Sequence, residues 1–163
     1  TADVILIPEI PYDLAKVCDK IRERDRRGRH FSIVVVAEGA FPRGGQESTI
    51  GTSLPGESRR VGGIAARIAW DIEQMTGKES RSLVLGHLQR GGMPTGYDRL
   101  LAARFGGAAV EAVERKEWGH MVALQSPHIV TIPFTEALAV PRRVDPNHDI
   151  VRTARATGIS FGD

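Results

Sequence analysis

A histidine and an arginine three residues apart, followed by two glycines, form the part of the sequence with the clearest chemical signature. His87 and Arg90 follow the apolar run 82–85 and precede Gly91 and Gly92. Arginine offers two parallel donors to phosphate oxygens, imidazole offers another, and glycine lets the backbone approach an anion closely. The pair predicts a phosphate-binding site; the alternative is an incidental basic residue beside a structural histidine. The helix expected after it, with Thr95 as its cap and Asp98 completing a capping box, would add backbone N–H groups and the positive end of its dipole to such a site.

Glu38 and Arg81 are two further candidates. Glu38 ends an apolar run and could accept hydrogen bonds from sugar hydroxyls, or it could be a solvated strand terminus. Arg81 precedes the run 82–85, and an extended segment would place it roughly 30 Å from Arg90. We therefore expect that Arg81 does not share the pocket of Arg90 within one subunit. It could reach the site of a neighbouring subunit, or it could be an ordinary surface arginine.

The basic run 26–30 is a third candidate. It contains Arg27, Gly28 and Arg29 at the expected end of a helix, where cations are favourable beside the negative end of the helix dipole. An anion-binding role and a nucleic-acid patch are the alternatives. The aromatic content of 6% and the lack of a recognition motif argue against nucleic acid.

These residues need elements to position them, and the apolar pattern predicts an α/β domain of three αβα layers with a mostly parallel sheet. Strand, helix and strand alternate over the first 37 residues, which indicates a βαβ unit. The expected strands are 4–7, 31–36, 82–85, 121–124 and 129–132, and the expected helices are 12–27, 61–76 and 95–116.

Two of the helices carry an expected buried stripe, and the segments around them carry no regular pattern. The stripes are Ile64, Ile68, Ile72 and Met75, and Leu101, Phe105, Ala109 and Val113. Residues 38–60 form a long loop rich in glycine and proline, which is usually functional or disordered. We expect the tail from Ala139 to pack loosely or to join another part of a larger molecule.

Composition excludes several classes of protein. A chain of 163 residues with 41% hydrophobic and 26% charged residues is typical of a globular domain. No apolar run spans a bilayer and no leader pattern opens the chain, so we expect no membrane partner. The lone Cys18 favours a reducing, cytoplasmic location. Phosphate-loop, nucleophile-elbow and metal-spacing motifs are missing.

The motifs resemble the carboxyl-terminal half of a bacterial 6-phosphofructokinase over nearly the whole chain. The matching segments, in family order, are 3–9 (DVILIPE), 34–39 (VVVAEG), 76–81 (TGKESR), 86–92 (GHLQRGG) and 94–99 (PTGYDR). The long loop after Glu38 is similar to that of the actinobacterial or pyrophosphate-related branch. The resemblance implies residues 1–92 as a fructose 6-phosphate-binding domain, and 93–163 as a part that packs on or returns to the nucleotide domain.

The resemblance also implies roles for residues. Glu38 would bind the sugar, His87 and Arg90 its 6-phosphate, and Arg81 the 6-phosphate of the adjacent subunit. An effector site would use Asp3 on the effector's magnesium, together with Arg27, Gly28 and Arg29, although arginines replace the lysines common there.

The family's nucleotide and catalytic motifs (Gly-Gly-Asp, Thr-X-Asp-Asn-Asp, Met-Gly-Arg) do not occur in this chain. We therefore expect no catalytic residue and no metal ligand of the reaction here, and an inactive isolated piece. Mg²⁺ and ATP or pyrophosphate would bind mainly through the missing half. The implied whole is a glycolytic, allosteric homo-oligomer, a dimer or tetramer. The alternatives are a pyrophosphate-dependent phosphotransferase and a non-catalytic sugar-phosphate-binding module.

Overall fold

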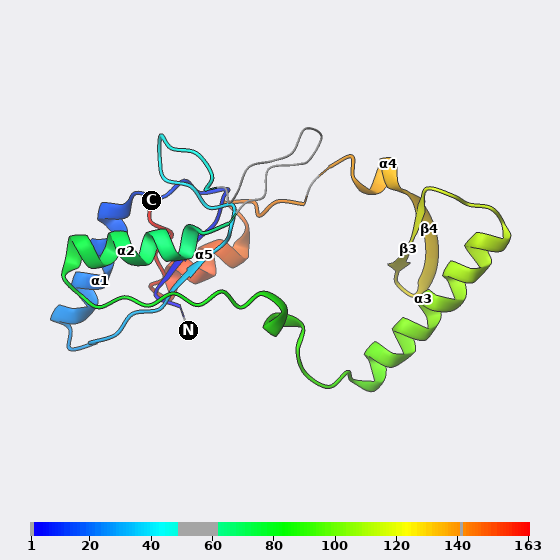
Figure 1. Cartoon of the computed structure of the whole chain (residues 1–163), viewed down its shortest axis with the longest axis horizontal. Helices are drawn as coiled ribbons and strands as arrows, with labels where there is room; N and C mark the ends of the chain where they lie inside the picture. The colour runs from blue at the N-terminus through cyan, green and yellow to red at the C-terminus, as the bar shows by residue number, and fades with distance from the viewer. Residues whose placement is uncertain (1, 49–61, 141) are drawn as a thin grey trace. The chain divides into compact units, whose positions relative to one another are not determined.

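The protein, described by a computed structural model over residues 2–48, 62–140 and 142–163, divides into two compact units (Figure 1). Unit 1 comprises Thr1–Val84 with Arg143–Asp163, and unit 2 comprises Leu85–Arg142. This division differs from the boundary expected after residue 92. The expected return of 93–163 to a nucleotide domain concerns a longer protein and stays a prediction.

The sheet of unit 1 is built around its first strand. β1 (Val4–Leu6) pairs in parallel with β2 (Val34–Val36), and α1 (Leu14–Arg26) connects them, so the predicted βαβ unit is confirmed. On the other side of β1, Val4 forms a parallel bridge with Ser160. The Ile5 amide donates to the Ser160 carbonyl at 2.9 Å. β1 therefore lies between the second strand and the tail of the chain.

Side chains of β1 alternate between two faces, and helices cover both. Val4 and Leu6 are fully buried in a cluster that includes residues of α1 and of α2 (Ile64–Thr76). Ile5 and Ile7 pack instead against a second cluster that contains residues of α5 (Asp149–Ala156). Successive strand residues point to opposite faces, so this arrangement is the predicted three-layer α/β/α fold.

The tail is part of this core, which corrects the expectation that it packs loosely. Val151 and Phe161 are buried together with Ile10. The Arg155 guanidinium donates to both carboxylate oxygens of Asp163 at 2.8 and 2.6 Å and lies over the Phe161 ring. Apolar positions spaced along α5 therefore bury one face of the tail helix against β1.

The start of α1 and the end of α2 lie at residues that favour helix ends. Asp13 caps α1 by accepting a hydrogen bond from the Ala15 amide at 2.9 Å. α2 ends at Gly77, whose φ of +67° suits the left-handed cap position that glycine favours. Its predicted stripe is confirmed at Ile64, Ile68 and Ile72, whereas Met75 is exposed although its sulfur lies 3.9 Å from that of Cys18. The expected helix start at Val61 lies outside the described residues, as does much of the loop 38–60.

The predicted strand 82–85 is absent, and the predicted strand 31–36 is too long. Residues 82–85 form no strand, and Leu83 is 73% exposed; the chain continues as a 3₁₀ helix, η1 (Gly86–Arg90). The predicted strand 31–36 shortens to β2, and Phe31 is exposed. A β-branched or apolar run becomes a strand only where another strand pairs with it, and 82–85 has no such partner among the described residues.

Unit 2 consists of one long helix and a hairpin. α3 (Gly96–Glu114) lies against β3 (His120–Gln125) and β4 (His128–Pro133), which pair antiparallel and lead into α4 (Phe134–Ala137). The hairpin and its turn at residues 126–127 are confirmed. The predicted buried stripe is not fully formed, because no residue of α3 is buried: Leu101 and Phe105 are half-buried and Ala109 and Val113 are exposed. The half-buried side of the helix continues instead through Ala108 and Ala112. None of the described helices is both long and apolar enough to cross a membrane.

Candidate anion-binding site

His87 and Arg90 lie on the 3₁₀ helix η1, whose geometry places their side chains on the same side of the helix. A 3₁₀ helix has three residues per turn, so side chains at i and i+3 project in the same direction. Both residues are exposed, and within the described residues neither side chain forms an intramolecular hydrogen bond or ion pair. The turn closes where the Gly91 amide donates to the Leu88 carbonyl at 3.1 Å. The pair can therefore act on one small anion.

The glycines at both ends of η1 allow this local shape. Gly86 has φ +47° and Gly92 has φ +110°, backbone conformations that L side chains rarely adopt. Each has open space around the position of a Cβ atom, so the constraint is conformational rather than steric. Gly86 therefore forms the turn that enters η1 and Gly92 the turn that leaves it, whereas Gly91, the other member of the glycine pair, has an ordinary φ of −75°.

The start of α3 is occupied by the protein itself. Thr95 accepts a hydrogen bond from the Asp98 amide at 3.2 Å, and Asp98 Oδ2 accepts from the Thr95 amide at 2.8 Å and from its hydroxyl at 2.7 Å. This capping box confirms the predicted cap. The hydroxyl of Thr95, followed by its amide, lowers the pKa of Asp98. A carboxylate therefore already neutralises the helix end that was expected to help bind an anion.

Glu38 and Arg81 belong to unit 1. Glu38 is exposed two residues beyond the end of β2, at the carboxyl edge of the sheet, as predicted. Arg81 is 86% exposed, and its Nε and Nη2 donate to Glu79 Oε1 at 2.9 and 2.6 Å. His87 and Arg90 belong to unit 2, so a site that unites all four residues stays a prediction.

Asp3, the predicted effector residue, takes part in a tight internal network. Its side chain is 11% exposed; Oδ1 lies 2.8 Å from Arg24 Nη1, and Oδ2 accepts from the Ile33 amide at 2.8 Å. These contacts join the start of β1 to the end of α1 and to the approach to β2. Asp3 therefore has a structural role that sequence reasoning missed, because Arg24 is distant in sequence and carries no motif.

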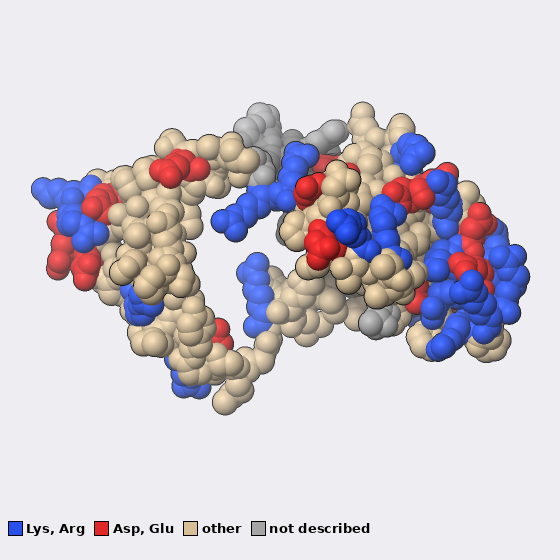
Figure 2. All heavy atoms as spheres, turned by 180° about the vertical axis from the view of Figure 1, so that it is seen from behind, with Lys and Arg blue, Asp and Glu red and all other residues tan. Residues whose placement is uncertain are grey.

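Arg27, Gly28 and Arg29 form the exposed loop after α1, where charges of both signs are mixed (Figure 2). Arg27 Nη2 lies 2.6 Å from Glu23 Oε1, and Gly28 adopts φ +77°. The hydrogen bond from Lys20 is the largest cause that lowers the pKa of Glu23, ahead of the charge of Arg27. An anion bound here would have to compete with Glu23 for Arg27, so the effector role stays a prediction.

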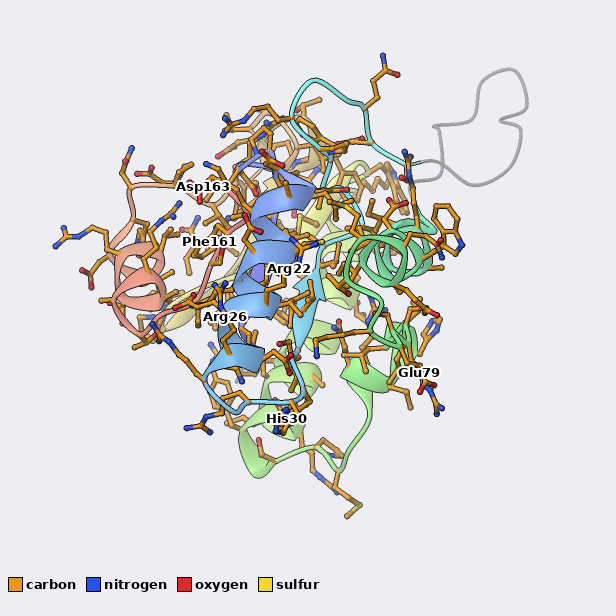
Figure 3. The ribbon with its side chains drawn as sticks, turned by 90° about the vertical axis from the view of Figure 1, so that its left-hand side faces the viewer. Arg22, Arg26, His30, Glu79, Phe161 and Asp163 are labelled. Carbon is orange, nitrogen blue, oxygen red and sulfur yellow. The ribbon has the colours of Figure 1, made fainter. Side chains whose placement is uncertain are left out.

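A further charged cluster joins this loop to the segment after α2. Asp25 Oδ1 lies 2.9 Å from Lys78 Nζ and 3.3 Å from His30 Nδ1. Figure 3 labels His30 and, in the second loop, Glu79. The hydrogen bond from Lys78, followed by that from His30, lowers the pKa of Asp25. No sequence signal predicts this cluster, because its members come together only when α1 packs on α2.

Two other kinds of binding site among the described residues would be a metal centre and an apolar pocket. Within residues 2–48, 62–140 and 142–163, no three acidic, histidine or cysteine side chains gather as a metal site would require. Asp3 is already engaged by Arg24. The described residues therefore do not fit a magnesium centre. A shallow hollow of about 420 Å³ in unit 2, beside Val113, Trp118 and Met121, includes none of the predicted site residues.

The fold and these side chains define a class of protein: a three-layer α/β domain that presents cationic and carboxylate side chains suited to a phosphorylated ligand. A family model described as phosphofructokinase matches residues 1–113, which is more than half of the chain. The chain belongs to the phosphofructokinase family.

Relatives and solved structures agree with this assignment. The chain is 52% identical over 162 residues to an ATP-dependent 6-phosphofructokinase of Chloroflexus aurantiacus and 47% identical over 164 residues to one of Spirochaeta thermophila. In both cases 99% of this chain covers 44% of the relative, so the chain spans less than half the length of these curated relatives.

Two solved structures resemble the protein. A phosphofructokinase from Saccharomyces cerevisiae matches 85% of this chain and 17% of its own, with a TM-score of 0.56 and 26% identity. A pyrophosphate-dependent phosphofructokinase from Nitrosospira multiformis matches 98% of this chain and 41% of its own, with a TM-score of 0.59 and 23% identity. The second likeness supports the fold.

Proposed function

We propose that this chain is the carboxyl-terminal, sugar-phosphate-binding part of a 6-phosphofructokinase that converts fructose 6-phosphate to fructose 1,6-bisphosphate. The observation that carries the proposal is the pair His87 and Arg90 on one side of η1, within the span of the phosphofructokinase family match. In this proposal both side chains bind the 6-phosphate, Glu38 accepts hydrogen bonds from the sugar, and Arg81 reaches the 6-phosphate of a neighbouring subunit.

The chemistry assigned to these residues is recognition. A guanidinium and an imidazole hold the phosphate dianion, and the carboxylate of Glu38 orients the sugar so that its 1-hydroxyl faces the phosphoryl donor. Phosphoryl transfer also needs a metal, a donor and a residue that accepts the hydroxyl proton. We assign Mg²⁺, the donor and the catalytic residues to the rest of a longer protein.

ATP is the donor that we propose, because the relatives at 52% and 47% identity are named ATP-dependent. The pyrophosphate-dependent reaction is the second candidate, favoured by the long loop after Glu38, which resembles that of the actinobacterial or pyrophosphate-related branch. Comparing ATP with pyrophosphate as donor for the full-length protein separates the two. A non-catalytic module, the third candidate, requires that the full-length protein bind the sugar phosphate without consuming either donor.

The wider setting of the proposal is a cytoplasmic, glycolytic enzyme that works as a homo-oligomer. The expected reach of Arg81 into a neighbour's site requires at least a dimer. An effector anion at Arg27, Gly28 and Arg29 would make the enzyme allosteric, provided that it displaces Glu23 from Arg27.

Replacing Arg90 tests the proposal. In the full-length protein, Arg90→Ala should raise KM for fructose 6-phosphate roughly 10- to 100-fold, because a charged hydrogen bond to the phosphate is lost. Steady-state kinetics measures the change. Arg152→Ala, at an exposed arginine of α5, is the matched control and should leave KM unchanged. An unchanged KM in Arg90→Ala would contradict the assignment of the pocket.

A further inference from the structure

Backbone amides of the short segment between the end of α2 and Arg81 form hydrogen bonds with side chains of α2. The Lys78 amide donates to Thr76 Oγ1 at 3.3 Å, and the Ser80 amide donates to Glu73 Oε2 at 3.2 Å. The Ser80 hydroxyl donates to the Lys78 carbonyl at 3.1 Å. The first two hydrogen bonds therefore hold the residues directly before Arg81 against the last turns of α2, and the third stabilises the segment internally.

The side chain of Lys78 adds a contact across the fold. Its Nζ lies 2.9 Å from Asp25 Oδ1, which joins the segment after α2 to the last turn of α1. Both side chains are little more than one-third exposed, at 36% and 38%, so water screens the pair only in part. Nearby, Arg22 Nη2 donates to the Met75 carbonyl at 2.6 Å, a second contact between the two helices. The segment is thus fixed to two helices rather than one.

Arg81 itself has little to hold it. Its side chain is exposed, and among the described residues its hydrogen bonds go only to Glu79, two positions earlier on the same segment. The direction in which the guanidinium can reach is therefore set by the backbone of 78–80. A displacement of about 1 Å in a group that positions a substrate is enough to weaken its action substantially.

We propose that Lys78 is a positioning residue for Arg81: through its ion pair with Asp25 it fixes the segment from which Arg81 reaches a sugar phosphate. The proposal rests on the role of Arg81 in the proposed function. It assigns to Lys78 no contact with the substrate, so its effect on affinity must pass through Arg81. Lys78→Arg keeps the charge and should retain the function.

Steady-state kinetics of the full-length protein provides the test. Lys78→Gln and Asp25→Asn should each raise KM for fructose 6-phosphate roughly two- to fivefold, the scale of a partly exposed ion pair, with a smaller change in kcat. The double variant Asp25→Lys with Lys78→Asp exchanges the two charges, and its KM should return most of the way to that of the unmodified protein. Lys20→Gln is the matched control, because Lys20 pairs with Glu23 at 3.2 Å within α1 and has no contact with the segment before Arg81.

A double-variant cycle distinguishes positioning from general loss of stability. In an Arg81→Ala background, Lys78→Gln should have no further effect on KM. A further increase of the same size there would overturn the proposal, as would Lys78→Gln and Asp25→Asn variants that keep the original KM while Arg81→Ala raises it. If Arg81→Ala alone leaves KM unchanged, the role of Arg81 in the proposed function fails as well.

Discussion

Internal hydrogen bonds and ion pairs decide which of the acidic side chains are available to a ligand. Asp3 is engaged by Arg24 and by the Ile33 amide, and Asp98 by Thr95, whereas Glu38 is exposed beyond the end of its strand. A side chain that already has strong internal partners must lose them before it can bind anything else. At the scale of residues, Glu38 is therefore better suited to a ligand than Asp3.

The cap of α3 should respond to acid. Hydrogen bonds hold the pKa of Asp98 below its ordinary value of 3.8, so the cap contributes its full stability above that value and loses it as the pH falls through the lower, folded pKa. NMR secondary shifts of residues 96–99, followed between about pH 3 and pH 6, should show the first turn loosening at the acid end.

Asp98→Asn isolates the effect of the charge. This variant should abolish the acid-dependent loosening of the turn, while Glu114→Gln at the other end of α3 should retain it. A pH profile of Asp98→Asn that matches the unmodified protein would show that another group causes the change.

The strands and helices of unit 1 are stabilised by contacts with segments that are distant in sequence. β1 has β2 on one side and Ser160 on the other, and α5 covers the sheet face opposite to α1 and α2. The tail thus supplies one layer of the fold. Its contribution comes from burial, since Phe161 is only 4% exposed.

Phe161→Ala should be severely destabilising. Removing a buried phenylalanine costs about 3–5 kcal/mol through lost burial and a residual cavity. The urea midpoint of the full-length protein, followed by near-ultraviolet circular dichroism, measures the loss. Phe134→Ala provides the control, because Phe134 in α4 is 48% exposed and should change the midpoint little. Equal shifts in the two variants would argue that the tail does not stabilise unit 1.

At the scale of the whole molecule, the proposed function assigns substrate recognition to this chain, whose sequence lacks the family's nucleotide motifs. It covers 44% of relatives that are named as ATP-dependent enzymes, and its described residues gather no metal ligands. Binding and phosphoryl transfer should therefore be separable by cutting the protein at the start of this chain.

The isolated 163 residues should not turn over substrate. A coupled assay with fructose 6-phosphate, Mg²⁺ and either ATP or pyrophosphate should give the buffer rate, whereas the full-length protein should be active with one of them, because the donor and acceptor are held in line only there. Phosphofructokinase activity of the isolated chain would contradict the assignment of phosphoryl transfer to the rest of the longer protein.

Sequence reasoning succeeded where the signal is local. The Thr95 cap and the isoleucine stripe of α2 are set by neighbours a few residues apart, and both are present in the structure. The hairpin 121–132 is likewise a local pairing.

Predictions failed where the outcome depends on distant partners. Residues 82–85 have strand-like composition but no partner in the described chain. The tail gave no strong periodic signal, although its residues Val151 and Phe161 are buried beside Ile5 of β1. The Asp25–Lys78 pair exists because two helices pack together, which no spacing of residues announces. The resemblance of the motifs indicated the family, but it gave Asp3 no structural role.

The parallel bridge between Val4 and Ser160 has a consequence for biosynthesis. A ribosome that adds about 5–20 residues each second makes the second of these positions roughly 10 to 30 seconds after the first. Throughout that interval the nascent β1 has an open edge and an apolar face that α5 does not yet cover. Chaperones that shield such edges would therefore be needed chiefly before the last helix leaves the exit tunnel.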